Sequence, residues 1–422
     1  MVGEWSSRNF GDCAALVRDT VSPAEALGAP YVGLEHIGEG TLSLVGRGVA
    51  ADVTSAKFRF RGRDILFGKL RPYFRKVVMA PFDGVCSTDI WVVRARDAVE
   101  QRFLFYYMAS PDFVGEATRA SEGTKMPRAQ WSYLSQLPLA LPPLSEQRAI
   151  AHILGTLDDK IELNRRMNAT LEAIARAIFK SWFVDFDPVH AKARGEQPYG
   201  MDAKTAALFP DAFEDSELGP IPAGWGIGAL DTIAHFQNGL ALQKYPPEDD
   251  EYLPVIKIRE LRQGYSDNKS DKASPNIKEE CILYDGDVVF SWSGSLLVDI
   301  WCGGKAALNQ HLFKVTSETY PKWFYYYWTL HHLDEFQRIA ADKATTMGHI
   351  KRGHLSAAKL PIPPRDLLER ADEVIAPYLE TQVINRLQAR TLSELRDALL
   401  PKLISGEIRV SEAEALSGEV TP

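Results

Sequence analysis

Two stretches of the chain carry apolar residues in alternating steps of four and three, which is the spacing of a coiled-coil seam. The first runs from position 150 to 182 and has eight apolar residues at ten seam positions; the second, offset by 221 residues, has seven. The pattern predicts two long paired helices, with an amphipathic helix on a globular core as the alternative. The seam residues we single out are Leu157, Ile161, Asn164, Asn168, Leu171, Ile178, Asn385, Leu392 and Leu399.

Asparagines interrupt the middle of both patterns. Buried Asn residues in a coiled coil fix register or orientation at some expense of stability. Two such helices in one chain pair economically as an antiparallel rod, and we expect the blocks that precede them to lie at its opposite ends. Pro377 and Pro401 fall inside the second pattern, and we expect them to distort or restart that helix because proline lacks the backbone N–H.

The blocks that precede the helices repeat at nearly the same offset. Trp5 aligns with Trp225, and the aromatic hexapeptide at 103–108 aligns with the one at 323–328. The period is far longer than the roughly 20–50 residues of a solenoid repeat. The chain is therefore interpreted as one domain-plus-helix unit used twice.

Each block is predicted to be rich in β-strands. Short apolar runs between Gly and Pro residues predict strands at 64–67, 90–93, 287–290 and 312–315. The aromatic hexapeptides are expected on helices that pack against these sheets, since unbroken aromatic runs favour a core. The alternative is a base-stacking platform, which would use Tyr106, Tyr107, Tyr325 and Tyr326.

Charge at first argues against a nucleic-acid partner. The 422 residues include 48 Lys+Arg and 56 Asp+Glu, for a formal net charge of −8. Residues 185–222 and 366–422 each carry −5, so the rest of the chain sums to +2. Residues 57–76 hold eight basic side chains against Asp64 alone. Such a cluster either meets phosphates or is the solvated face of a strand, and the acidic total no longer excludes DNA.

The composition is that of an ordinary folded protein, with 45% hydrophobic and 25% charged residues. Four cysteines without CxxC spacing indicate neither a disulfide framework nor a zinc ribbon. No window approaches the ~18 apolar residues of a membrane span, and the first 13 residues lack a secretion-signal pattern. We expect a cytoplasmic protein.

Several segments resemble the specificity (S) subunits of type I restriction–modification systems. Those similar to the central conserved region of that family are PPLSEQRAI at 142–150, LDDKI at 157–161, IFKSWFVDF at 178–186, LFPD at 208–211 and DSELGPIPAGW at 215–225. The segment LLPKLISGEI at 399–408 resembles the distal conserved region. The resemblance extends over the whole chain.

The resemblance implies a non-catalytic DNA-specificity subunit that recognises a bipartite, asymmetric site in double-stranded DNA. Two methyltransferase (modification) subunits and then restriction (motor-nuclease) subunits would assemble on it. The implied fold is α+β, with two β-rich α/β target-recognition domains joined by two long antiparallel coiled-coil helices in a pseudo-two-fold repeat. The expected divisions are domain 1 at 1–141, the central helix at 142–186, an acidic connector at 187–222, domain 2 at 223–364, the distal helix at 365–408 and a tail at 409–422.

Polar and basic residues in the two blocks are the candidate DNA contacts. In the family, the segments GKLRP at 68–72 and CSTD at 86–89 have recurrent counterparts, whereas the second block has WSGS at 292–295 and NQH at 309–311. The difference suggests two different half-sites. Arg suits guanine, Gln suits adenine, and Lys and Ser more often contact phosphate. The candidates are Lys69, Arg71, Thr124, Lys125, Ser293, Ser295, Gln310, His311, Thr346, His349 and Lys351.

Catalytic motifs are not evident in the sequence, and no cofactor or metal is predicted. There is no GxxxxGK[ST] loop, no HExxH pattern and no Asn/Asp-Pro-Pro-aromatic methyltransferase motif. Two alternatives stay open. One is a free-standing nuclease that uses Asp112 with Asp158 and Lys160, or Asp267 with Lys269. The other is a coiled-coil adaptor without a DNA role, which the acidic total supports.

Overall fold

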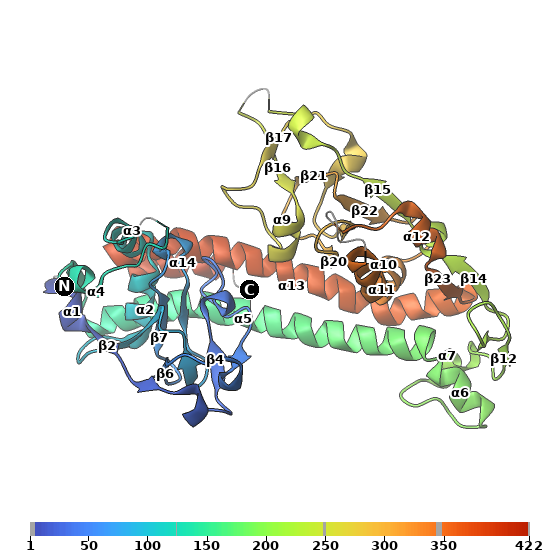
Figure 1. Ribbon diagram of the computed structural model, residues 1–422, viewed down its shortest axis with the longest axis horizontal. Coiled ribbons are helices and arrows are strands. Elements are labelled where there is room, and N and C mark those ends of the chain that lie inside the picture. Colours follow the sequence, from blue (N-terminus) through green and yellow to red (C-terminus); the bar gives the residue numbers. More distant parts are fainter. Residues whose placement is uncertain (1–4, 124, 248–249, 343–347, 421–422) are drawn as a thin grey trace. The chain divides into compact units, whose positions relative to one another are not determined.

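A computed structural model of the chain describes residues 5–123, 125–247, 250–342 and 348–420 (Figure 1). The chain divides into two compact units. Unit 1 comprises Met1–Glu162 together with Thr391–Pro422, and unit 2 is the continuous segment Leu163–Arg390. No helix in the described part of the chain is long and apolar enough to cross a membrane.

Two long helices, α5 (Leu144–Phe179) and α13 (Arg365–Ser405), each give one part to unit 1 and the other part to unit 2. In unit 1, Arg396 Nη1 donates to Asp158 Oδ1 over 2.8 Å. In unit 2, Asn385 Nδ2 donates to Asn168 Oδ1 over 2.8 Å. Within unit 2, Asn164 of α5 contacts Gln388 of α13, whereas the later residue Asn168 contacts the earlier residues Gln382 and Asn385. The paired segments there run antiparallel, as expected for two domain–helix copies in one chain.

The seam residues are mostly inaccessible to solvent. Leu157 and Leu392 are fully buried, and Asn164 and Asn385 are nearly so. Ile161 and Leu399 are also buried, while Asn168, Leu171 and Ile178 are partly exposed. The asparagines are satisfied within unit 2, since Asn164 Nδ2 donates to Gln388 Oε1 and Asn168 Nδ2 donates to the carbonyl of Gln382.

Pro377 does not restart the second helix, contrary to the expectation from sequence. Helix α13 continues through Pro377 and Pro401 as one element of 41 residues. A proline deprives the carbonyl four residues earlier of its N–H partner. Pro377 and Glu373 both lie on the exposed side of α13, so that carbonyl can turn to water and the helix survives.

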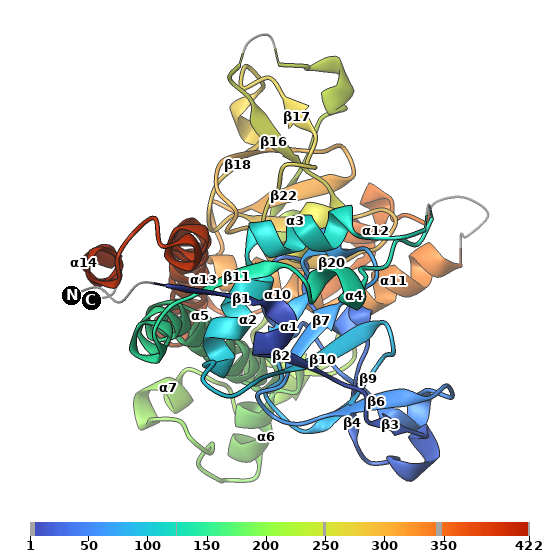
Figure 2. The ribbon, with the colours of Figure 1, turned by 90° about the vertical axis from the view of Figure 1, so that its left-hand side faces the viewer.

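Unit 1 contains three sheets, with strand orders β1-β11, β2-β10-β7-β8 and β3-β6-β9-β4-β5. Helix α2 packs against β8 and β10, and Figure 2 shows α2 beside the central sheet that contains β10. The strands are β1 (Ser6–Asn9), β2 (Ala14–Val17), β3 (Thr20–Val21), β4 (Pro30–Val32), β5 (Gly48–Val49), β6 (Lys57–Phe60), β7 (Ile65–Gly68), β8 (Val77–Met79), β9 (Gly84–Cys86), β10 (Ile90–Ala95) and β11 (Pro138–Leu141). The helices besides α5 and α13 are α1 (Phe10–Cys13), α2 (Gln101–Ala109), α3 (Pro111–Arg119), α4 (Trp131–Leu134) and α14 (Val410–Val420).

Unit 2 repeats the central sheet of unit 1, with strand order β15-β22-β19-β20. Its strands are β12 (Phe213–Glu214), β13 (Ile221–Pro222), β14 (Gly226–Ala229), β15 (His235–Asn238), β16 (Leu253–Ile256), β17 (Lys272–Ala273), β18 (Ile282–Leu283), β19 (Val288–Ser291), β20 (Leu297–Ile300), β21 (Ala306–Leu308), β22 (Leu312–Thr316) and β23 (Lys359–Ile362). Its shorter helices are α6 (Asp187–Ala193), α7 (Ala203–Ala207), α8 (Leu230–Ile233), α9 (Ile258–Gln263), α10 (Lys322–His331), α11 (Leu333–Ala341) and α12 (Arg352–Ala357).

The four strands predicted from sequence are present as β7, β10, β19 and β22, each displaced by no more than two residues. In both units the central sheet is antiparallel, because β10 pairs with β2 and β7 just as β22 pairs with β15 and β19. The same order of elements in both units confirms the internal repeat inferred from the sequence.

The aromatic hexapeptides lie on α2 and α10 and belong to the core, as expected. Trp323 and Phe324 are fully buried, and Phe179 of α5 packs against Tyr327 and Trp328 with ring centroids 5.4 and 5.1 Å apart. Such pairs add roughly 0.5–1.5 kcal/mol beyond area burial. The alternative of a base-stacking platform is wrong for Tyr106, Tyr325 and Tyr326, all at most 6% exposed.

Candidate nucleic-acid interface

The candidate DNA contacts of unit 1 lie on a loop held by main-chain hydrogen bonds. Lys69 directly follows β7, and its N–H donates to the carbonyl of Asp89 over 2.9 Å. The Lys69 carbonyl accepts from the N–H of Ala129 over 2.9 Å, and the Arg71 N–H donates to the carbonyl of Pro127 over 2.8 Å. Three loops far apart in sequence are thereby brought side by side.

Two arginines on this loop adopt the left-handed backbone conformation. Arg71 has φ 51° and Arg75 has φ 49°, on either side of the 3-10 helix Pro72–Phe74. Such residues cost of order 1–3 kcal/mol and persist only where their surroundings fix them. Arg75 Nε donates to the Ala109 carbonyl over 2.7 Å, and its Nη2 contacts Asp397 of α13 at 3.1 Å. The loop is thus anchored at its far end.

Unit 2 builds the same arrangement from different residues. The Trp292 N–H donates to the carbonyl of His311 over 3.3 Å, and the Trp292 carbonyl accepts from the Ile350 N–H over 3.0 Å. The Gly294 N–H donates to the carbonyl of Gly348 over 2.8 Å. Trp292 thus occupies the position of Lys69. The two units share one main-chain scaffold, which we call the loop cluster of each unit.

The side chains on the two loop clusters differ in charge. In unit 1, Arg128 forms an ion pair with Asp89, with 2.9 Å between Nε and Oδ1, and this pair raises the pKa of the arginine. In unit 2, Ser293 Oγ lies 2.9 Å from His311 Nδ1, and the Trp292 ring lies 6.0 Å from that of His311. The unit 1 cluster thus carries cations and a carboxylate, whereas the unit 2 cluster carries an imidazole beside a hydroxyl and an indole N–H that are both buried.

Most of the sequence-predicted site residues gather on these clusters. In unit 1, Lys69, Arg71 and Lys125 come together, with Arg71 Nη2 3.4 Å from the Lys125 carbonyl oxygen. In unit 2 the residues on or next to the cluster are Ser293, Ser295, Gln310, His311, His349 and Lys351. Thr124 and Thr346 lie outside the described residues.

Sequence reasoning missed three members of the clusters. Arg128 and Asp89 are 39 positions apart and become neighbours only through the fold. Asp89 and Trp292 belong to the segments at 86–89 and 292–295 that the sequence singles out. Asp89 directly precedes the strand predicted at 90–93, and Trp292 lies two residues beyond the strand predicted at 287–290, where loop side chains of a sheet edge gather.

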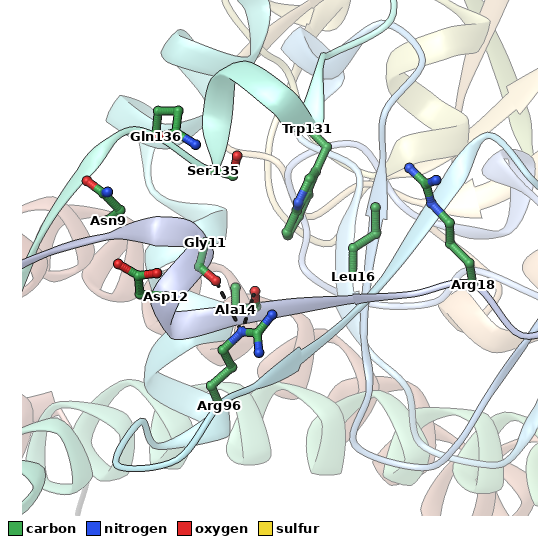
Figure 3. A pocket seen from close by; sticks show the side chains of 10 residues that line it. All are labelled: Asn9, Gly11, Asp12, Ala14, Leu16, Arg18, Arg96, Trp131, Ser135 and Gln136. Carbon is green, nitrogen blue, oxygen red and sulfur yellow. Dashed lines mark hydrogen bonds between the residues drawn. The ribbon is translucent and has the colours of Figure 1, made fainter.

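The pocket drawn in Figure 3 has a volume of about 540 Å³ and lies beside α1 and α4 of unit 1. Arg18, Arg96, Trp131 and Asp12 line it, and Arg96 Nε donates to the Gly11 carbonyl over 3.1 Å. The lining therefore mixes cations with a carboxylate. Its described residues include none of the predicted DNA contacts.

Two of the acids that suggested a nuclease, Asp158 and Asp267, are engaged in structural contacts, whereas Asp112 lies exposed at the start of α3. Asp158 accepts hydrogen bonds from Tyr106 Oη over 2.6 Å and from Arg396 over 2.8 Å. Hydrogen bonds from Arg259 lower the pKa of Asp267 to about 2. Among the residues with described positions, no three His, Cys, Asp or Glu side chains are grouped to hold a metal ion.

Comparison with known proteins assigns the family. A family model described as type I restriction modification DNA specificity domain matches residues 30–173 and 222–396, so both copies of the repeat are covered. The chain belongs to the family of type I restriction–modification specificity subunits. It is therefore the DNA specificity subunit of a type I system, a non-catalytic component of that complex.

Similar proteins include two specificity subunits of comparable length. The chain is 26% identical over 407 residues to the type I restriction enzyme HindI specificity subunit of Haemophilus influenzae, covering 84% of this chain and 88% of that protein. It is 27% identical over 326 residues to the MjaIX specificity subunit of Methanocaldococcus jannaschii, covering 75% and 71%.

A solved structure shares the fold. The crystal structure of the type I restriction–modification S subunit from M. genitalium has a TM-score of 0.52 and 15% sequence identity, and the match covers 95% of this chain and 96% of that one.

Proposed function

We propose that each β-rich domain reads one half of a split, asymmetric target in double-stranded DNA. The observation that carries this proposal is the pair of loop clusters, which share their main-chain hydrogen bonds but differ in side chains. A common scaffold gives both domains the same way of approaching DNA, while different side chains give different base preferences. The resulting half-sites differ in sequence.

The individual DNA contacts follow from the chemistry of each cluster. Lys69 and Lys125 position phosphates, and Arg71 contacts phosphate or guanine. In unit 2, Gln310 reads adenine, and the other proposed DNA contacts are Ser293, Ser295, His311, His349 and Lys351. Thr124 of the first domain and Thr346 of the second are the remaining proposed contacts. The divisions proposed for the chain are those given by the sequence: 1–141, 142–186, 187–222, 223–364, 365–408 and 409–422.

We infer that two methyltransferase subunits dock on this chain and that restriction motor-nuclease subunits join them in the cytoplasm. Family membership supports this assembly. The charge distribution does as well, because the two domains are close to neutral and bind DNA weakly by charge alone. Partners that contribute further phosphate contacts would raise the affinity.

The sharpest test maps methylated bases in the source genome, with and without an intact gene for this chain. One split motif with a constant unread spacer is expected, and it disappears when the gene is disrupted. Scattered or undivided motifs would contradict the proposal. At the level of contacts, Lys69→Ala with Arg71→Ala should weaken DNA binding by the complex and flatten its salt dependence by about two phosphate contacts.

A further inference from the structure

The two loop clusters have equivalent backbones, so the side chains at equivalent positions can be compared directly. Their main-chain bonds are equivalent, so the backbone does not distinguish one half-site from the other. Whatever makes the half-sites different must lie in the side chains. The equivalent positions are Arg71 and Gly294, Asp89 and His311, and Arg128 and His349.

Arg128 is a cation of the unit 1 cluster that is held through both its backbone and its side chain. Its backbone N–H donates to the Glu122 carbonyl over 2.9 Å, and its carbonyl accepts from the Glu122 N–H over 3.1 Å. The next residue, Ala129, bonds to Lys69 on the other side. The backbone at Arg128 is therefore held between two neighbouring segments, which leaves little freedom in where its side chain begins.

Asp89 also fixes the orientation of the Arg128 side chain. Nε lies 2.9 Å from Oδ1 and Nη2 lies 3.3 Å from Oδ2, so the carboxylate faces one edge of the guanidinium. The Asp89 N–H is itself bonded to Ser87 Oγ over 3.2 Å. Despite this contact the Arg128 side chain remains 42% exposed.

The free edge of this guanidinium has the donors that guanine recognition requires. Arginine carries five N–H groups, and Asp89 engages two of them. Three remain, and they include one on each terminal nitrogen. Two parallel donors match O6 and N7 of guanine in the major groove. A fixed orientation lowers the entropy lost on binding.

We propose that Arg128, oriented by Asp89, reads a guanine in the half-site recognised by unit 1. This inference rests on the function proposed above. Asp89 acts as a positioning residue, because it binds the edge of the guanidinium that points away from the base. Unit 2 has His349 and His311 at the equivalent positions, so its half-site lacks this contact.

The test uses the full chain copurified with its methyltransferase subunits. The complex methylates a library of duplexes with randomised bases, and sequencing of the modified pool gives the base preference at every position. The variants are Arg128→Gln, Arg128→Lys and Asp89→Asn. Arg119→Gln is the matched control, because Arg119 is an exposed, ion-paired arginine of the same unit outside the loop cluster.

In the Arg128→Gln and Arg128→Lys complexes, the preference for guanine at one position of one half-site should fall by about 5- to 150-fold. Asp89→Asn should weaken the same preference by less, while Arg119→Gln leaves it unchanged. The other half-site keeps its preferences in every variant, which shows that the chain is folded and assembled. If Arg128→Gln does not fold, Arg128→Lys and Asp89→Asn decide the outcome.

Two results would overturn the inference. One is an unchanged base preference in the Arg128 variants. The other is that Arg128→Gln lowers methylation equally at all sequences while Arg128→Lys keeps the wild-type level. That result would identify a phosphate contact. A wild-type complex that methylates no split motif would instead refute the proposed function, so the two failures are distinguishable.

Discussion

Replacing Asp158 by Ala should destabilise unit 1 more than any comparable change to an exposed ion pair. Asp158 lies on α5, where Arg396 of α13 and Tyr106 of α2 both donate to its carboxylate. The Arg396 side chain is only 2% exposed. Removing Asp158 therefore leaves a buried guanidinium with one fewer counterion and a buried tyrosine hydroxyl without its acceptor.

The magnitude follows from what remains around Arg396. Breaking a buried pair by removing one partner costs roughly 3–5 kcal/mol. Asp397 stays 3.2 Å from Arg396 and is 41% exposed, so part of the charge remains compensated. We therefore expect the lower end of the range, about 3 kcal/mol. Asp158→Leu combined with Arg396→Met should recover the part of this loss that comes from the unpaired guanidinium, while the Tyr106 hydroxyl still lacks its acceptor.

Hydrogen exchange read by mass spectrometry suits this measurement, since a chain of two units has no single unfolding transition. Amides at 150–160 and 391–403 should exchange about a hundredfold faster in Asp158→Ala. The control is Glu369→Ala on α13, whose partner Arg365 is 90% exposed; its loss should cost about 0.3–0.5 kcal/mol. Equal, small effects of the two changes, or no recovery in the double variant, would refute the reasoning.

Three further results are expected. Asn385→Ala leaves the Asn168 amide oxygen unsatisfied and should cost about 1–3 kcal/mol, read as faster hydrogen exchange of the unit 2 amides of α5 and α13; replacing both Asn168 and Asn385 by Leu should be close to neutral. Gly239→Ala places a Cβ 2.2 Å from the carbonyl oxygen of Asn309 and should abolish methylation that depends on the unit 2 half-site while sparing DNA contacts of unit 1. Asp267 has a pKa lowered to about 2, so its stabilisation is present above about pH 4 and is lost as the pH falls towards 2; the difference in stability between wild type and Asp267→Asn, read from hydrogen exchange of amides in and around α9, should shrink over that range.

Much of the fold could be predicted because the local spacing of apolar residues determines where its helices and strands form. The seam steps of four and three identify α5 and α13, and apolar runs between turn residues identify β7, β10, β19 and β22. The aromatic hexapeptides could be assigned to the core from their composition, because six successive large, mostly aromatic side chains leave a helix no polar face. The expected restart at Pro377 is absent because a local rule ignores that the carbonyl freed by the proline lies on the exposed side of α13.

The candidate interface was harder to predict because it depends on contacts distant in sequence. Lys69 and Arg71 were chosen for their charge, and the structure brings them beside Lys125. Arg128 was overlooked, since its partner Asp89 lies on another strand connection and no short motif joins them. The correspondence of the segments at 68–72 and 86–89 with those at 292–295 and 309–311 could be predicted from the repeat, but the main-chain bonds that join each pair could not, because the paired segments are distant in sequence.

The division of the two long helices between the units determines which unit can be completed first as the chain is synthesised. Unit 2 is one continuous segment, whereas unit 1 begins the chain and needs Thr391–Pro422 to complete it. While a ribosome makes the chain from its N-terminus, Leu154 and Leu157 of α5 emerge early, before the end of α13 exists. Unit 1 is thus the first to begin synthesis and the last to be completed. A chain truncated before Thr391 would lack Arg396, the partner of Asp158 on α5, so unit 1 would stay incomplete.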